Sequence, residues 1–425
     1  MVTETPGELA IRVYRELHRH PEIGLRVPRT LRTIEEALAG LPLELHRGEA
    51  IDSLVAVLPG PAGGPVAVLR ADTDALPIEE SSEHELRSEI EGAMHACGHD
   101  GHSAMLVGAA HALAASELRP PGPVVMMWQP GEEGYEGMAA MIDEGLMELV
   151  DGLGPVQRSY GLHLLSDPGV PRGVFTGRAG PSHASTATFE IVLEGRGGHA
   201  AFPHLAEDPV PACAALISAL NVAMTRTRDP FDPAVLTVGA VAAGDAPNVI
   251  AERAVLRGTI RAYSVASGEQ IVGMVRRTAD GIAAAHGLRA EVLIEGGYPS
   301  VVNDAACVEH FADVVTAALG EGRFQPMRNP LPAGDDYARL LERIPGAFFM
   351  LGAGLPDAAG TMHPNHSPGV RFDESVLVDG VAALAAIALD PLPAAGTEEA
   401  AGTAEPRVRG FRAAADSDML EGDTE

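Results

Sequence analysis

The chain contains no lysine, so every fixed positive charge on a side chain belongs to an arginine. The 30 arginines face 59 acidic residues, which gives a formal net charge of −29. Because a chain this acidic offers no basic surface, we expect no nucleic-acid partner. We interpret the acidity as a determinant of solubility, and it need not imply a cationic substrate.

Cysteine and long apolar runs are also scarce. The three cysteines, at positions 97, 213 and 307, are too few and too scattered for a disulfide framework, which favours the reducing cytoplasm. No apolar run reaches the length of a membrane span, and the N-terminal segment lacks the basic and apolar regions of a secretory signal. We therefore expect a cytoplasmic protein without a membrane partner.

The length of 425 residues exceeds what one hydrophobic core usually supports, so two domains are expected. In the first part of the chain, helical spacing of apolar residues alternates with short β-branched runs. This alternation predicts an α/β fold with a mostly parallel sheet and helices on both faces. We expect helices over 7–20, 101–118 and 138–150, and strands over 54–58, 66–69 and 124–128.

The middle of the chain reads strand–helix–strand–strand–helix–strand, which is typical of a small ferredoxin-like α+β sandwich. The first pattern returns afterwards, with helices over 305–319 and 373–389 and a strand over 347–351. The sequence thus predicts a larger domain over 1–179 and 296–390, with a smaller inserted domain over 180–295. Residues 391–425 show little periodicity, and we expect them to form a disordered acidic tail.

One short segment, 94–102, concentrates metal-ligand side chains around Cys97 and His99. Thiolate and imidazole groups bind zinc, cobalt, nickel or manganese to different degrees. A single cysteine is usually a small core hydrophobe, and we keep that interpretation for Cys213 and Cys307. Two histidines within two residues of Cys97 favour a metal ligand there instead, and Gly98 allows the sharp backbone that presents both side chains to one site.

Two adjacent carboxylates, Glu132 and Glu133, follow a predicted strand at the end where α/β sites lie. One carboxylate can bind a metal while its neighbour takes a proton from a metal-activated water. Taken alone, such a pair is more often a solvated acidic turn. Further histidines lie at predicted strand ends or turns, and their joint presence favours a metal-dependent hydrolase: His163, His199, His204, His363 and His366.

The motifs together resemble the M20 metallopeptidase family, specifically its subfamily of hippurate hydrolases, aminoacylases and auxin-conjugate hydrolases. The resemblance covers about residues 14–390, and its motifs occur in the family's order. They are His18-Arg-His-Pro-Glu22, Arg70-Ala-Asp-Thr-Asp-Ala-Leu-Pro-Ile78, Met94–His102, Gly131-Glu-Glu-Gly134, Gly161-Leu-His163, Gly197-Gly-His-Ala200, Ala246-Pro-Asn-Val-Ile250 and His366-Ser-Pro368.

The resemblance implies two divalent metal ions (Mn, Zn, Co or Ni), with five ligands: Cys97, His99, Glu133, His163 and His366. It implies that Glu132 is the general base and that His199, in a lid domain, polarises the scissile carbonyl. Asn248 matches a residue near the substrate's carboxylate, and Asp74 matches an aspartate that supports the metal site. The resemblance further implies a homodimer, or a higher homo-oligomer, formed through the lid domains.

Two stretches depart from the family pattern. The family often has Glu-Asp-Phe where this chain has Asp335-Asp-Tyr337, and Ser81–Ser88 is unusually polar for a stretch near the substrate pocket. These departures bear on the identity of the substrate more than on the chemistry.

The leading hypothesis is a metal-dependent amidohydrolase that cleaves small N-acyl amino acids. A dipeptidase or desuccinylase of the same broad family is an alternative, although such relatives usually have an aspartate in place of Cys97. Another alternative is a hydrolase with Cys97 as nucleophile, which would not depend on metal. A non-catalytic binding protein is disfavoured because Glu132 is present.

Overall fold

The computed structural model describes residues 4–81 and 85–390, so the expected tail over 391–425 lies outside the described residues. The described chain forms two units. The first comprises the residues up to Ser182, Val301–Pro330 and those from Asp335 onward. The second comprises His183–Ser300 and Leu331–Gly334. The second unit is thus inserted in the first, and its function as a lid stays a prediction.

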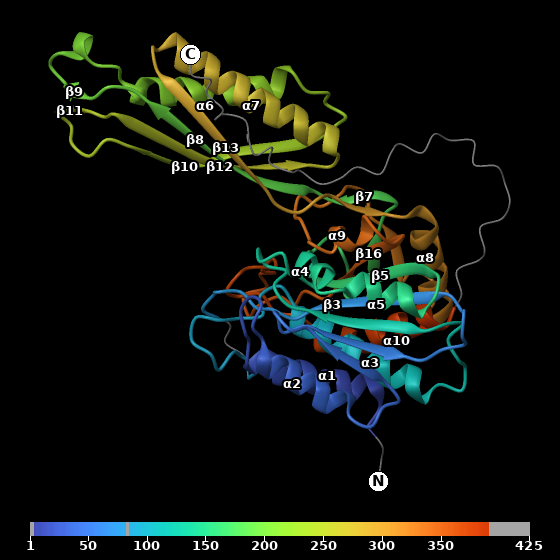
Figure 1. Ribbon diagram of the computed structural model, residues 1–425. Helices are drawn as coiled ribbons and strands as arrows, with labels where there is room; N and C mark the ends of the chain where they lie inside the picture. The colour runs from blue at the N-terminus through green and yellow to red at the C-terminus, as the bar shows by residue number, and fades with distance from the viewer. Residues whose placement is uncertain (1–3, 82–84, 391–425) are drawn as a thin grey trace, which may run out of the picture. The chain divides into compact units, whose positions relative to one another are not determined.

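The first unit contains an eight-stranded sheet in the order β1-β2-β4-β3-β5-β16-β6-β15 (Figure 1). The inner strands β4, β3, β5 and β16 are parallel, whereas the pairs β1–β2, β2–β4 and β16–β6 are antiparallel. This arrangement confirms the predicted α/β fold. The strands are β1 (Glu44–Arg47), β2 (Leu54–Leu58), β3 (Val66–Asp72), β4 (Val124–Gln129), β5 (Val156–Leu165), β6 (Phe175–Gly177), β15 (Phe324–Pro326) and β16 (Gly346–Gly352), with a separate ladder of β7 (Gly180–His183) and β14 (Val301–Asn303).

Helices cover both faces of this sheet. Figure 1 shows α1, α2 and α3 on one side and α4 and α9 on the other. The helices of this unit are α1 (Pro6–Arg19), α2 (Pro28–Leu38), α3 (His99–Ala115), α4 (Gly137–Asp143), α5 (Leu146–Leu153), α8 (Ala305–Leu319), α9 (Ala338–Leu341) and α10 (Leu377–Leu389), with the short 3-10 helix η2 (Glu374–Val376).

The central strand β3 is buried along its whole length. Leu69 and Ala71 belong to the apolar core that also contains side chains of α1, α3 and α10. Because successive side chains of a strand point to opposite faces, Arg70 and Asp72 face the other side of the sheet. The alternation therefore separates the apolar core from the polar residues at the carboxyl end of β3.

Two predicted helices differ from the observed ones at glycines. The expected helix over 138–150 is two helices, since Gly145, with φ of 99°, separates α4 from α5. The helix expected from residue 101 begins two residues earlier, at His99, because Gly98 adopts φ of 92° directly before it. The ligand-rich segment thus leads straight into the first turn of α3.

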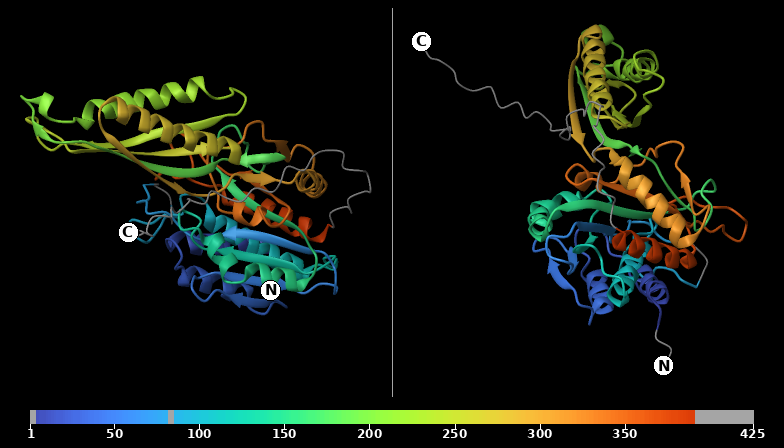
Figure 2. Two further views of the ribbon diagram at one scale, coloured as in Figure 1. Left: turned by 45° about the horizontal axis from the view of Figure 1, so that its top comes forward. Right: turned by 90° about the vertical axis from the view of Figure 1, so that its right-hand side faces the viewer.

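The second unit contains an antiparallel sheet in the order β10-β12-β8-β13, and α6 and α7 cover one of its faces (Figure 2). Its order along the chain is the predicted strand–helix–strand–strand–helix–strand. The elements are β8 (Ser185–Glu194), α6 (Pro209–Arg226), β10 (Ala234–Ala243), β12 (Arg253–Ala262), α7 (Val265–Ala285) and β13 (Arg289–Gly296), with a small ladder of β9 (Gly198–His199) and β11 (Val249–Ile250) and the 3-10 helix η1 (Pro203–Leu205). Among the described helices of both units, none has the length and apolarity needed to cross a membrane.

A buried ion pair joins α1 to α3. His18 is 4% exposed, and its Nδ1 lies 2.7 Å from Asp100 Oδ2 while its Nε2 lies 3.6 Å from Glu80 Oε1. Burial by itself lowers the pKa of His18, but the hydrogen bond with Asp100 and the Glu80 carboxylate raise it to about 9. A raised histidine pKa stabilises the fold below the unfolded value, and this contribution disappears as the pH rises through the folded value.

We therefore expect the difference in unfolding free energy between the wild type and His18→Gln to be largest at pH 6 and to decrease towards pH 9. The expected decrease is on the order of 3 kcal/mol, because one pKa unit corresponds to about 1.4 kcal/mol. Urea unfolding at pH 6, 7.5 and 9 measures it, and His46→Gln, at an exposed position of β1, is the control. A difference that does not change with pH would contradict the prediction.

Candidate metal centre

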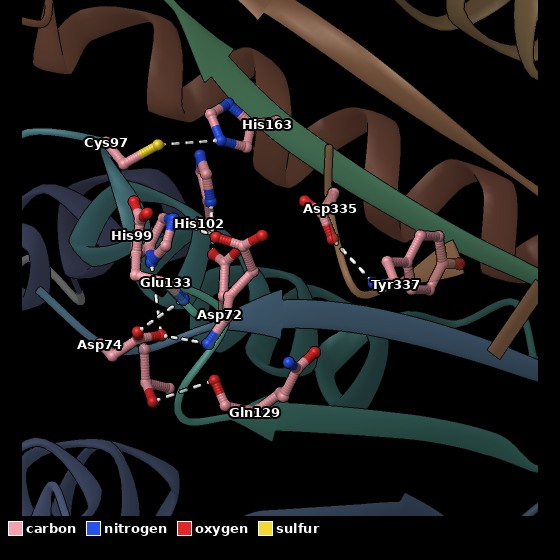
Figure 3. A network of polar contacts seen from close by, with 12 residues as sticks. Asp72, Asp74, Cys97, His99, His102, Gln129, Glu133, His163, Asp335 and Tyr337 are labelled. Carbon is pink, nitrogen blue, oxygen red and sulfur yellow. Dashed lines mark hydrogen bonds and ion pairs between the residues drawn. The ribbon is translucent and has the colours of Figure 1, made fainter. Parts of the chain in front are cut away.

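The predicted ligands come together at the carboxyl ends of the central parallel strands. Asp72 ends β3, Gln129 ends β4, and the Glu132–Glu133 turn follows β4 directly. The segment around Cys97 and the first turn of α3 lie beside them, as Figure 3 shows. This edge of a parallel sheet is where the side chains of neighbouring strands can converge on one ligand.

Cys97 belongs to two groups of candidate ligands, one with His99 and His163 and the other with Glu133 and His366. Its Sγ lies 3.3 Å from His163 Nε2 and 3.2 Å from His366 Nε2. The ligand atoms of Cys97, His99 and His163 lie within 4.8 Å of one another, and so do those of Cys97, Glu133 and His366. One thiolate within reach of both sets suits a pair of neighbouring cations.

His99 provides the test of whether the site suits a metal. Its ring is completely buried, yet among the described residues neither ring nitrogen has a hydrogen-bond partner. Its nitrogens lie 3.6 Å from Asp72 Oδ2 and 3.6 Å from Asp74 Oδ1, and 4.0 Å from Glu132 Oε2. A buried imidazole without a hydrogen bond requires an explanation. Coordination of a divalent ion provides one, because thiolate, imidazole and carboxylate ligands fit zinc, cobalt, nickel or manganese.

Asp74 holds the turn that carries the two glutamates. Its carboxylate accepts the backbone N–H of Glu132 at 2.9 Å and that of Glu133 at 3.1 Å. The glycines at both ends of the turn have positive φ, 73° at Gly131 and 86° at Gly134. Glu132 is 6% exposed, and burial, followed by the charges of nearby carboxylates, raises its pKa well above the usual range. A carboxylate of this kind can accept a proton near neutral pH.

His102, in the same segment as His99, lies next to the proposed ligands, since its ring centroid is 4.4 Å from that of His163 and 5.4 Å from that of His99, but its two nitrogens have other partners. Its Nδ1 lies 2.5 Å from Asp72 Oδ1, and the backbone N–H of Leu164 donates to its Nε2 at 2.7 Å. Because Nε2 accepts a hydrogen bond, the ring is neutral and donates from Nδ1 to Asp72. Both nitrogens of His102 are therefore already used within the protein.

His366 and His363 occupy different surroundings. The Nε2 of His366 lies 3.1 Å from Glu133 Oε1 as well as near Cys97, and hydrogen bonds to these two groups raise its pKa to about 10. Its backbone φ is 66°, a strained value for a residue other than glycine, and its N–H donates to Ala96 O at 2.9 Å. His363 instead pairs with Asp357 at 3.0 Å.

A buried cluster of charged side chains lies next to the ligands, and the sequence did not predict it. We call it the ionic layer, and it consists of Arg70, Asp72, Asp335 and Asp336. Arg70, 2% exposed, contacts the carboxylates of Asp72, Asp335 and Asp336 at 2.8, 3.2 and 3.3 Å. Its Nε donates to Gln129 Oε1 at 2.9 Å. The available signals were an arginine directly after the strand expected over 66–69 and the departure at 335–337, but neither reveals the partner of the other.

The predicted residues of the second unit, His199 and Asn248, lie beside one another. The N–H of Ala200 donates to Asn248 O at 3.1 Å, and His199 pairs with Val249 in the β9–β11 ladder. The N–H of Ala201 donates to His199 Nδ1 at 3.1 Å, so that the ring proton of neutral His199 is on Nε2. The roles of His199 and Asn248 stay predictions.

Comparisons with known proteins agree on one family. The sequence profile of peptidase family M20/M25/M40 matches residues 68–390. The chain is 35% identical over 386 residues to IAA-amino acid hydrolase ILR1-like 2 of Arabidopsis thaliana, covering 90% of this chain and 85% of that protein. It is 33% identical over 368 residues to N-acetylcysteine deacetylase of Bacillus subtilis (strain 168), covering 86% and 92%.

Solved structures are similar over nearly the whole chain. The YXEP protein of Bacillus subtilis, described as a dinuclear metal binding peptidase from the M20 family, has a TM-score of 0.75 at 30% identity, covering 90% of this chain and 98% of that one. A putative aminohydrolase from methicillin resistant Staphylococcus aureus has a TM-score of 0.82 at 28% identity, covering 91% and 97%.

The different surroundings of the two histidines allow a direct test of the ligand set. We expect His366→Ala to bind less metal per chain than the wild type, because it removes a group that contacts both Cys97 and Glu133. His363→Ala is the matched control, since it removes a histidine of the same loop that pairs with Asp357, and it should keep the wild-type metal content. Elemental analysis after dialysis measures both. Equal metal content in the two variants would reject His366 as a ligand.

Proposed function

Because the chain belongs to peptidase family M20/M25/M40, we propose that it is a metal-dependent amidohydrolase that cleaves the amide bond of N-acyl amino acids. The observation that supports it most is the position of Cys97, shared by two ligand sets beside the buried Glu132. The names of two relatives, an IAA-amino acid hydrolase and an N-acetylcysteine deacetylase, support acylated amino acids as the substrate class.

The proposed cofactor is a pair of divalent ions, manganese, zinc, cobalt or nickel, and the similarity to a dinuclear metal binding peptidase supports the number. The proposed ligands are the five residues of the two sets that share the thiol: Cys97, His99, Glu133, His163 and His366. When bound, such ions supply Lewis acidity that activates water and polarises a carbonyl.

Glu132 is proposed to accept the proton of the attacking water and to deliver it to the nitrogen of the leaving amine. The reaction consumes one water, breaks the C–N bond and yields a carboxylic acid and a free amino acid. The hydrogen bonds from the turn to Asp74 support this role, because they fix the backbone from which the Glu132 side chain projects.

In the second unit, His199 is proposed to donate a hydrogen bond from Nε2 to the carbonyl oxygen that becomes negatively charged, and Asn248 to bind the substrate's carboxylate. The bond from Ala201 N–H to His199 Nδ1 supports a donor at Nε2. We also propose a cytoplasmic homodimer formed through the second unit. Exposed apolar side chains on and near its edge strand β10 support such a contact, among them Phe231 at 93% and Val241 at 50% exposure.

A cysteine-nucleophile hydrolase is the second candidate, because the Cys97 thiol lies 3.3 Å from an imidazole of His163. Metal depletion distinguishes the metal-dependent amidohydrolase from the cysteine-nucleophile hydrolase. A panel of N-acetyl, N-benzoyl and indole-acetyl amino acids, with dipeptides for comparison, is assayed before chelation, after it and after readdition of each metal. Loss and recovery of hydrolysis supports the amidohydrolase, whereas chelator-resistant hydrolysis that alkylation abolishes supports the cysteine nucleophile.

We expect Glu132→Gln to reduce kcat by about 10²- to 10⁴-fold while it keeps the wild-type metal content, because it removes a proton acceptor and no proposed ligand. Steady-state kinetics and elemental analysis on the same preparation measure both quantities. Glu136→Gln, in the same loop and paired with Arg339, is the control and should stay close to wild type. Near-normal turnover by Glu132→Gln would assign the base to another residue.

We expect His199→Ala to lower kcat by about 10²- to 10³-fold, the typical cost of losing one hydrogen-bond donor to the oxyanion. His204→Ala is the control, because it removes a nearby histidine of the same unit. Full activity of His199→Ala would remove the proposed role.

Mixing His199→Ala chains with Glu132→Gln chains tests whether subunits share the site. Partial recovery of activity in the mixed dimers is expected if His199 acts on the partner's substrate. Its absence in confirmed mixed dimers would contradict sharing.

A further inference from the structure

The turn that carries Glu132 and Glu133 is held at both of its ends by one buried carboxylate, that of Asp336. Before the turn, the Gln129 side-chain NH2 lies 2.7 and 2.8 Å from the two oxygens of Asp336. After the turn, the backbone N–H of Met138 donates to Asp336 Oδ2 at 2.9 Å. Asp336 thus joins the end of β4 to the start of α4 across the intervening loop. We call these contacts of Asp336, with the Gln129 side chain and with the Met138 N–H, the Asp336 bracket.

Asp336 is itself fixed by buried contacts. It is completely buried, and Arg70 Nη2 lies 3.3 Å from its Oδ1. The Arg70 guanidinium also bonds to Gln129 and Asp72 and lies 5.4 Å from the centre of the Tyr337 ring. In a region this buried, water cannot replace a lost partner, so each bond constrains the position of the carboxylate.

Asp74 and Asp336 bind different parts of the loop that carries the two glutamates. Asp74 accepts the N–H groups of Glu132 and Glu133 in its middle, whereas Asp336 binds the residues that flank it, Gln129 and Met138. The carboxylate oxygens of Glu132 and Asp336 lie within 4.8 Å of each other. A shift of Asp336 would therefore move the ends of the loop and change where the Glu132 carboxylate points.

We propose that Asp336 is a positioning residue for amide hydrolysis, which acts through Gln129 and the Met138 amide to fix the Glu132 carboxylate against the substrate. This inference rests on the proposed function. It predicts an effect on the rate of reaction, because misplacing a reacting group by about 1 Å can cost on the order of 10²-fold in rate. It predicts no loss of metal, because none of the five proposed ligands bonds to Asp336.

The decisive variant is Asp336→Asn, which keeps the shape of the side chain and replaces one acceptor oxygen with an NH2 donor. That donor would face another donor, either the Gln129 NH2 or the Met138 N–H, so the bracket cannot form completely. We expect kcat to fall by roughly 10- to 100-fold, with KM and metal content close to wild type. Gln129→Met, of similar size and without the amide, tests the same bracket where Asp336→Asn fails to fold.

Tyr337→Phe is the matched control. It removes the 2.6 Å hydrogen bond with Ser159 Oγ next to Asp336 but leaves the bracket intact, and it introduces the residue that the family often has here. Its kcat should stay within about 2-fold of wild type, since it alters none of the three donors to Asp336, which are Arg70, Gln129 and the Met138 N–H. The double variant Asp336→Asn/Gln129→Met should lose less than the product of the two single losses, because both act on one bracket.

Hydrogen–deuterium exchange supplies a readout that does not depend on activity. The Met138 amide should exchange faster in Asp336→Asn than in wild type and Tyr337→Phe, because its acceptor is weakened. Wild-type kcat or unchanged exchange in folded Asp336→Asn overturns the inference, as does loss of metal. If the wild type itself cleaves no N-acyl amino acid, the proposed function fails, while the exchange measurement still tests the bracket.

Discussion

The structure of the first unit depends on keeping several carboxylates ionised or hydrogen-bonded where water cannot reach them. Asp72, Asp335 and Asp336 share the Arg70 guanidinium, and every one of these residues is at most 3% exposed. Removing one partner of such a group is costly, because it leaves a buried charge without compensation. The three carboxylates around this guanidinium also place acidic oxygens, a ligand type that divalent cations can use, at the edge of the sheet where the proposed ligands lie.

The local patterns predicted the parts of the site that lie close together in the sequence. The segment around Cys97 and His99 and the pair Glu132–Glu133 each contain their functional residue types within a few positions, so composition and spacing were sufficient. The ionic layer was not predictable in this way. Arg70 and Asp336 are 266 positions apart, and only the tertiary fold brings the strand β3 and the turn before α9 together.

Other details of the site depend on backbone conformations that residue type did not indicate. Apart from the family resemblance of His366-Ser-Pro368, residue type does not distinguish His363 from His366 as a ligand. In the structure the left-handed backbone at His366 directs its ring to Cys97 and Glu133, while His363 pairs with Asp357. Likewise, the apolar pattern over 138–150 continued through Gly145 and did not indicate that this glycine adopts a positive φ and divides the expected helix into two. At His366 a tertiary contact accompanies this conformation, since its N–H donates to Ala96 O across a long sequence separation, whereas the hydrogen bonds of Gly145 with Ile142 and Leu149 are local.

The short segment after Pro330 links the ionic layer to the second unit along the chain, because Leu331–Gly334 directly precede Asp335. Leu331–Gly334 belong to that unit, where Ala184 N–H contacts the carbonyls of Leu331 and Ala333 at 3.1 and 2.9 Å, whereas Asp335 already belongs to the first. A Cβ at Gly334 would lie 2.5 Å from Thr186 Cγ2, so the backbone passes closely there. The chain therefore goes from one set of fixed contacts to another across one peptide bond.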